Sequence, residues 1–186
     1  MEEKKKKNKK AYLNDFKKNE KGDYEYHGIQ FEWEGSKEEF SKEMIILWAA
    51  GLVMAVSLIT AGCLPVPGMM DCVYVILPYT VSVICGCSVL WGLCRLTKWG
   101  RSLRSYVYDA TVGQLPMRAI GTILGAAVSL IGECIYLIRN GAGGQTGGAV
   151  LFILVSVFVL ISMVFLVKRI KKMEWNQKTN KNIAKM

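Results

Sequence analysis

Histidine and closely paired cysteines are nearly missing from this 186-residue chain. It has one histidine, His27, and its six cysteines include no Cys-x-x-Cys pair. Zinc sites and thioredoxin-like redox centres are built from clusters of these residues at short spacings. The sequence therefore predicts no metal site and no cofactor.

Charge is missing from four long stretches, 45–64, 73–93, 119–138 and 149–167, which contain no Lys, Arg or Asp and only one Glu. About 20 apolar residues in a helix cross the roughly 30 Å hydrocarbon core of a bilayer. A soluble bundle would show polar residues at helical spacing on its outer face, whereas these stretches are apolar on all sides. The sequence predicts an all-α membrane protein, an antiparallel bundle of four transmembrane helices.

Lys and Arg flank these stretches unevenly. Both tails and the second connection are rich in them, whereas the first connection has none and the third has only Arg139. Because basic loops stay on the cytoplasmic side, we expect both termini in the cytoplasm. The predicted domains are a cytoplasmic basic tail (1–43), a four-span membrane domain (44–168) and a second cytoplasmic basic tail (169–186).

The net charge of +9 comes entirely from the part of the chain after residue 43, because eleven basic and eleven acidic side chains cancel within 1–43. No base-reading or stacking motif accompanies the charge, so nucleic-acid binding is not expected. We expect attraction to the anionic inner leaflet of the bilayer. Usage rich in Lys, Asn and Ile, with no glycosylation sequon, favours a bacterial plasma membrane.

The first apolar stretch ends in Ala61-Gly62-Cys63, which resembles the end of a bacterial lipoprotein signal. A signal peptide has a short basic leader, whereas here the 44 residues before the apolar stretch include eleven acidic side chains. Two prolines and Gly68 follow and favour a reversal of the chain. The sequence predicts a helical hairpin that stays in the membrane.

Two cytoplasmic segments are expected to have structure. In GDYEYHGIQFEWEG, polar and apolar residues alternate and change phase at His27-Gly28, which predicts a short β-hairpin with Tyr24 facing Phe31. Between spans two and three, apolar residues recur at helical spacing and predict an amphipathic helix along the inner leaflet, either a connector or a docking element. Its candidate lipid or partner contacts are Lys98, Trp99, Arg101 and Arg104.

Span three carries small residues at helical spacing, which allow two helix backbones to approach closely. The stripe consists of Gly121, Gly125, Ser129 and Gly132. It predicts either packing within the chain or the seam of a homo-oligomer, and packing within the chain is favoured.

Glu133 is the only acid well inside an apolar stretch. An intramembrane carboxylate is either a hydrogen-bonded clasp between helices or a proton or cation site. Small multidrug exporters also have four spans and one membrane glutamate, but theirs is in the first span, so nothing is carried over from them. The polar residues expected at a similar depth are Tyr79, Ser57, Thr60 and Ser156.

Cys63 and Cys72 flank the first outer turn, on the side of the membrane where cysteines can be oxidised to a disulfide. Closing this ten-residue loop would stabilise the fold by roughly 2.7 kcal/mol in the chain-entropy model. Quinone-linked disulfide oxidases and vitamin K epoxide reductases also combine four spans with outer cysteines, but their Cys-x-x-Cys centre is missing here.

The sequence favours a non-enzymatic membrane subunit or scaffold that binds membrane or cytosolic protein partners on its cytoplasmic side. The alternative is a small oligomeric transporter or channel with Glu133 on its pathway. A thiol-redox enzyme using Cys63 and Cys72 is the third interpretation.

Overall fold

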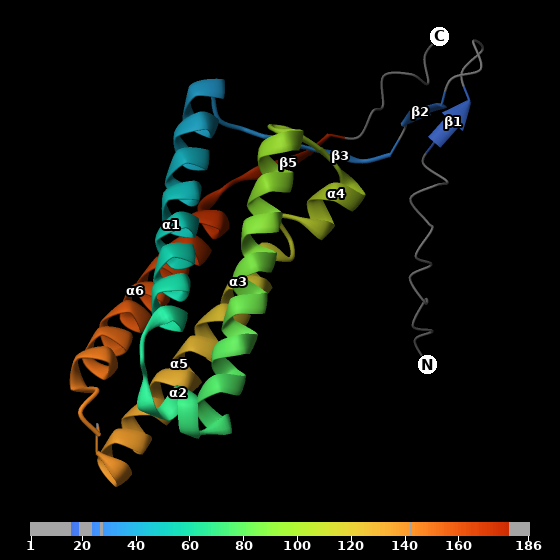
Figure 1. Ribbon diagram of the computed structural model, residues 1–186. Coiled ribbons are helices and arrows are strands. Elements are labelled where there is room, and N and C mark those ends of the chain that lie inside the picture. The colour runs from blue at the N-terminus through green and yellow to red at the C-terminus, as the bar shows by residue number, and fades with distance from the viewer. Residues whose placement is uncertain (1–15, 19–23, 27, 142, 179–186) are drawn as a thin grey trace, which may run out of the picture.

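Four long helices dominate the computed structural model, which describes residues 16–18, 24–26, 28–141 and 143–178. They are α1 (Lys37–Cys63), α3 (Val73–Trp99), α5 (Leu115–Asn140) and α6 (Thr146–Lys172). Each is long and apolar enough to cross a membrane. The helices lie side by side in a bundle (Figure 1), so the predicted four-helix architecture is confirmed, and a small sheet is added to it.

The helices extend beyond the apolar stretches because their first and last turns are polar. α1 begins at Lys37 rather than at residue 45, since Ser36 caps it. The Glu39 amide donates to Ser36 Oγ (3.2 Å), and the Ser36 amide donates to the Glu39 carboxylate (2.8 Å). Such a capping box satisfies two amides that a helix start leaves open. The apolar stretch therefore marks only the part of each helix that suits hydrocarbon.

The tightest packing in the bundle is between α3 and α5. α5 also packs against α6, and α6 packs against α1. α1 and α3 meet less closely, and a cavity of about 160 Å³ lies between them, lined mainly by apolar side chains of both helices. α3 therefore has one tightly packed face and one loosely packed face.

A three-stranded antiparallel sheet lies at one end of the bundle, which we call the sheet end (Figure 1). Its central strand β3 (Gln30–Trp33) precedes α1 and pairs with β4 (Ser102–Arg104), which follows α3, and with β5 (Trp175–Lys178), which follows α6. Three segments that are far apart in the sequence therefore meet in one sheet.

The predicted hairpin at His27-Gly28 is wrong. The strand β2 (Tyr24–Tyr26) pairs with β1 (Phe16–Lys18), whereas β3 pairs with β4 and β5. Alternating residues identify strands, but they do not identify partners, and β3 finds two partners from distant parts of the chain. His27 itself lies outside the described residues.

The predicted amphipathic helix between spans two and three is also wrong. α3 continues to Trp99 and stops at Gly100, whose φ of 68° belongs to the left-handed region that favours glycine. The chain then forms β4 and a short helix, α4 (Ser105–Ala110), before α5 begins. Leu103, expected on a helix face, is fully buried in a strand. The predicted helix is thus divided among three elements, the end of α3, β4 and α4, and the first break is at Gly100.

At the opposite end, a short helix α2 (Pro67–Asp71) joins α1 to α3. We call this the α2 end. The connection from α5 to α6 is also here, with Gly141, Gly143 and Gly144 at positive φ. α2 packs against α5, so this end is closed by a single turn of helix.

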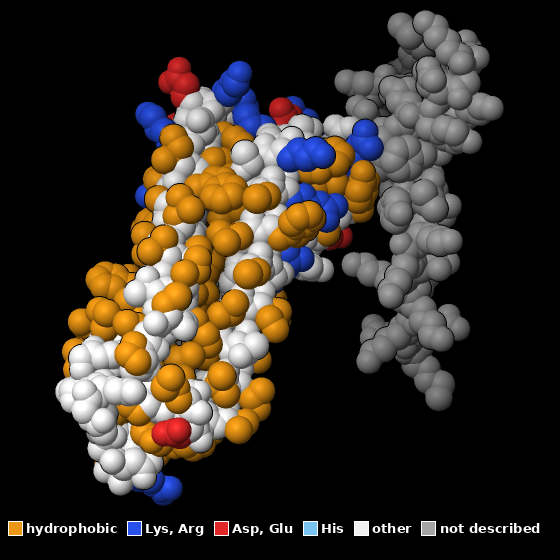
Figure 2. All heavy atoms as spheres, viewed as in Figure 1, with side chains coloured by type: hydrophobic (Ala, Val, Ile, Leu, Met, Phe, Trp, Pro, Cys, Tyr) orange, Lys and Arg blue, Asp and Glu red, His pale blue; other side chains and the backbone are white. Residues whose placement is uncertain are grey.

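Large apolar side chains point outward along the four long helices, including Ile59 (67% exposed), Ile84 (64%) and Ile138 (84%). Figure 2 shows hydrophobic side chains along the bundle, with most Lys, Arg, Asp and Glu gathered at the sheet end. A water-soluble bundle would not expose apolar surface on this scale.

Candidate functional sites at the two ends of the bundle

Glu133 lies on α5 at the α2 end and is fully buried. Its carboxylate sits under the backbone of α2, where the Gly68 amide donates to Oε1 over 3.4 Å. The other oxygen, Oε2, is buried and has no hydrogen-bond partner. A Cβ atom at Gly68 would overlap Oε2. The glycine is therefore what lets α2 close over the carboxylate.

A second contact fixes α2 one turn further along α5. Tyr136 Oη donates to Asp71 Oδ2 over 2.7 Å. α5 thus holds the start of α2 through Glu133 and its end through Tyr136. The two contacts hold α2 against α5 and leave Glu133 Oε2 without a hydrogen bond to any described residue.

The polar residues expected near Glu133 have other neighbours. Tyr79 Oη donates to the Leu58 carbonyl of α1 (2.5 Å), and its ring lies 6.4 Å from that of Phe152. Ser57 and Ser156 are buried on α1 and α6, and Thr60 is half-buried on α1. Within the described part of the chain, the structure gives none of the four a hydrogen bond to Glu133.

The small-residue stripe of span three packs against α3. A Cβ at Gly125 would lie 2.7 Å from the Pro78 carbonyl oxygen and 2.8 Å from the Ser82 nitrogen. Ser129 Oγ donates to the Val75 carbonyl over 3.0 Å. The stripe is therefore filled from within the chain by α3. The members of the stripe that face α3 are Gly121, Gly125, Ser129 and Gly132.

All six cysteines are free thiols in this structure, including Cys63, which is exposed at the end of α1, and Cys72, which is partly exposed before α3. Among the described residues, no three His, Cys, Asp or Glu side chains group in a way that could hold a metal ion.

Aromatic side chains from four elements pack together at the sheet end, and we call them the aromatic cluster. Phe31 of β3 stacks on Tyr108 of α4, with ring centroids 4.1 Å apart. Tyr108 also meets Trp175 of β5 edge-on at 5.8 Å. Phe40 of α1 lies between Trp33 and Trp175, at 5.5 and 6.4 Å. The cluster ties the sheet to the bundle, and the sequence reasoning missed it because its members are far apart in the chain.

Two ion pairs reinforce the sheet end. Glu32 of β3 pairs with Lys178 of β5, and the hydrogen bond and charge of this ammonium hold the pKa of Glu32 below its ordinary value. Glu43 of α1 pairs with Arg169 of α6 at 3.1 Å. Both pairs are partly exposed, so each adds little to stability by itself.

The residues expected to contact lipid or a partner fall into two groups. Arg101 turns inward and donates from Nη2 to the Gly35 carbonyl over 2.8 Å. The Arg104 guanidinium lies 5.6 Å from the centre of the Trp99 ring. Lys98 and Trp99 are exposed on α3. Lys98 and Trp99 are thus the exposed members of the set, Arg101 and Arg104 are half-buried, and the contact with lipid or a partner stays a prediction.

Two clefts flank the sheet. Within the described residues, the outer edges of β4 and β5 have no further strand beside them. An open strand edge can pair with an extended segment of another protein. One cleft, of about 410 Å³, is lined by Trp33, Glu34, Gly35, Glu39, Glu43, Lys172 and Glu174. The other, of about 430 Å³, is lined by Glu32, Trp33, Glu34, Arg101, Asn176 and Lys178.

A scan of protein-family models and searches of curated proteins and solved structures gave no match to this chain. The chemistry of the two ends of the bundle therefore indicates what the protein can do. Among the described residues, the α2 end holds a covered carboxylate, and the sheet end has two outer strands without a further strand beside them. Residues of the sheet and its flanks line two clefts there.

Proposed function

We propose that this protein is a four-span integral protein of a bacterial plasma membrane, with both termini in the cytoplasm, and that it serves as a non-enzymatic subunit or scaffold. One observation carries the proposal. β3 immediately precedes α1, β5 follows α6, and the two strands pair directly. The chain thus enters and leaves the bundle at the same end, which requires an even number of crossings.

The charge distribution supports the cytoplasmic placement of the sheet end. The last turns of α3 and α6 and the segment after α3 carry most of the Lys and Arg of this region, whereas the described α2 end has only Arg139. Short loops rich in Lys and Arg remain in the cytoplasm. Figure 2 shows the same concentration of charge at the sheet end.

The sheet supports the scaffold role because it is exposed on the side where a cytosolic partner would approach. Asn176, Gln177 and Lys178 of β5 are exposed. An extended segment of a partner would pair with the open edge of β5, with its side chains entering the adjoining cleft lined by Glu32 and Arg101. The aromatic cluster beneath keeps this edge in place.

Reporter fusions test the topology. A fluorescent protein that matures only in the cytoplasm, fused to either terminus, is expected to fluoresce in both fusions. Alkaline phosphatase, active only outside the cytoplasm, is expected to be inactive at both termini and active when inserted after Gly144 in the α5–α6 turn. Termini that report from opposite sides would overturn the proposal.

Site-specific photo-crosslinking in living cells tests the docking surface. A photoreactive amino acid at Asn176 or Gln177 is expected to give one discrete crosslinked product with a cytosolic or membrane protein. The matched control is exposed Gly147 at the α2 end, which should not give that product. Identical products from both ends, or none from β5, would contradict the scaffold role.

Transport is the second candidate, and the buried, unpaired Oε2 of Glu133 favours it. In that case α2 would have to move away, because Gly68 covers the carboxylate. Glu133→Gln is expected to abolish ion flux in proteoliposomes if Glu133 binds the ion. Unchanged flux in this variant, or no flux in the unmodified protein, would remove this candidate.

A further inference from the structure

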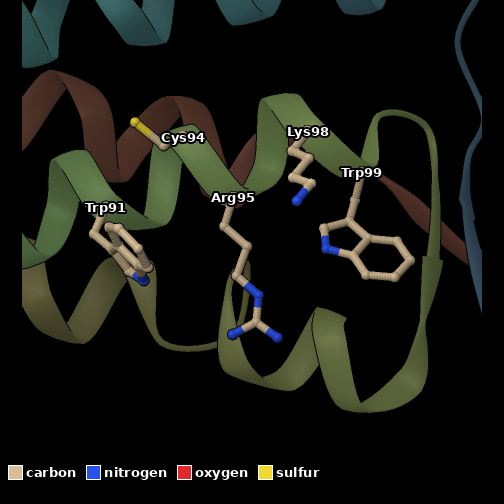
Figure 3. A pocket seen from close by; sticks show the side chains of 5 residues that line it. All are labelled: Trp91, Cys94, Arg95, Lys98 and Trp99. Atoms are coloured by element: carbon tan, nitrogen blue, oxygen red, sulfur yellow. The ribbon is translucent and has the colours of Figure 1, made fainter.

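One face of α3 at the sheet end carries alternating indole and cationic side chains. The spacing along α3 is four residues, then three, then one, which puts all the members on one side of the helix. These members are Trp91, Arg95, Lys98 and Trp99. Together with Cys94 they line a pocket of about 310 Å³. Figure 3 shows Arg95 between the two indoles, with its guanidinium directed away from α3.

Within the part of the chain that the structure describes, no acidic side chain pairs with either cation of this pocket. Neither Arg95 nor Lys98 has a hydrogen bond or ion pair to another described residue. Arg118, nearby on α5, is engaged instead: it donates to the Ser88 carbonyl (3.1 Å) and to Gln114 Oε1 (2.8 Å). The pocket therefore has two positive charges that an anionic ligand could pair with.

The indoles and the adjoining helix face identify the kind of anion. Trp91 is 71% exposed and Trp99 37% exposed, at the end of a helix whose next turns toward the α2 end expose apolar side chains such as Ile84. Indoles of this kind lie at the level of lipid headgroups. A ligand that fits must carry an anionic group at the height of Arg95 and a long apolar part along α3.

We propose that this pocket, the α3 pocket, binds the headgroup of one anionic phospholipid. The phosphate diester lies between Arg95 and Lys98, the indoles of Trp91 and Trp99 flank it, and the acyl chains run along the exposed face of α3. This inference rests on the proposed membrane insertion, and it names the lipid that the sheet end selects.

The test uses the full chain purified in detergent, with lipid binding followed by native mass spectrometry. Phosphatidylglycerol is expected to bind at least about tenfold more tightly than phosphatidylcholine, because each cation near a lipid surface contributes about 1 kcal/mol. The double variant Arg95→Gln/Lys98→Gln should lose this preference. The matched control, Lys168→Gln/Lys171→Gln, removes two exposed charges from the same end of α6 and should retain it.

Trp91→Ala supplies a second readout. It should weaken the binding of phosphatidylglycerol and of phosphatidylcholine to a similar extent, because the indole contacts both lipids and does not distinguish their charge. Inorganic phosphate should not displace phosphatidylglycerol at millimolar concentration, because it lacks the apolar part.

Three results would overturn the proposal. The first is equal affinity for the two lipids. The second is an equal loss of the phosphatidylglycerol preference in the α6 control, which would indicate a general effect of surface charge. The third is displacement by inorganic phosphate, which would indicate a soluble ligand. Any of these, with both terminal reporters still cytoplasmic, would remove the α3 pocket as a lipid site and leave the proposed topology in place.

Discussion

The α3–α5 interface and the sheet hold the same bundle together by different means. Along α3 and α5, glycine and serine bring two backbones into contact: Ser82 Oγ donates to the Thr122 carbonyl (3.1 Å), and Gly125 lies against α3. At the sheet end, rings and ion pairs join segments that the sequence keeps far apart, as Phe31 and Tyr108 do.

The difference follows from the surroundings we propose for each region. Between helices in lipid, burying apolar area gains little, so close packing and hydrogen bonds between helices provide the attraction. In water, burying aromatic rings is favourable in itself, and charge can assist it. Added side-chain volume should therefore lower the stability of the α3–α5 interface. Loss of an aromatic ring or a change of pH should alter the stability of the sheet.

The largest effect is expected from Gly125→Ala. The new methyl group would meet the Pro78 oxygen and Ser82 nitrogen, which are backbone atoms that cannot move separately. We expect the free energy of unfolding in detergent to fall by about 3 kcal/mol. Gly86→Ala is the control, because its methyl group meets the flexible ends of Met54 and Leu58 in the loosely packed α1–α3 face. Equal losses of unfolding free energy in the two variants would show that the α3–α5 interface is packed no more tightly than the α1–α3 face.

Gly68→Ala comes next and tests the contact between α2 and α5 at the α2 end. Its methyl group would displace the Glu133 carboxylate, at an expected loss of about 1–2 kcal/mol in unfolding free energy. The loss should nearly vanish in a Glu133→Ala background, because the two changes act on one contact. Gly147→Ala, where the added Cβ meets nothing within 4 Å, should be neutral. A loss that persists without Glu133 would place the strain elsewhere.

Phe31→Leu tests the sheet. It removes the stack on Tyr108, and we expect a loss of about 1 kcal/mol, with a weaker near-ultraviolet circular dichroism signal from the aromatic cluster. Phe158→Leu, on a 56% exposed position of α6, should change neither measurement. If both substitutions behave alike, the aromatic cluster does not stabilise the sheet.

The smallest effect is expected from pH. Lys178 lowers the pKa of Glu32 in the folded chain below the ordinary 4.5, so the pair stabilises the sheet above pH 4.5. This stability should be lost as the pH falls through the lowered pKa. Chemical unfolding at pH 7 and pH 3 should show that Glu32→Gln lowers the free energy of unfolding more at pH 7 than at pH 3. High salt should reduce the difference; a difference that grows at pH 3 would reverse the assigned sign.

The sequence predicts the bundle well, because hydrophobicity is a local signal. Four apolar stretches, only one of them with an acidic residue, correspond to the four long helices, and the errors lie in the polar turns, as where Ser36 starts α1 early. The pairing of strands in the sheet could not be predicted from the sequence. Phe31 and Trp33 alternate as a strand should, but the partners of β3 depend on where α3 and α6 end. Gly100 was the signal that the connection after span two is not one continuous helix.

The candidate sites were predicted as residues rather than as arrangements. Glu133 stands out in the sequence because it is a lone acid, yet its neighbour is the Gly68 amide rather than the expected hydroxyls. Depth counted along separate helices does not determine how those helices are rotated. Likewise, Arg101 and Lys98 look alike in the sequence, and only the fold turns one of them inward.

The central position of β3 determines when the sheet can be completed during synthesis. This strand leaves the ribosome before any of the long helices, yet its neighbours are translated only after α3 and after α6. A chain arrested or truncated before its last helix would keep one side of β3 bare, with Trp33 and Phe40 lacking the cover of Trp175. The side of β3 that pairs with β5 is thus shielded from a protease only after β5 has been translated and has paired with it.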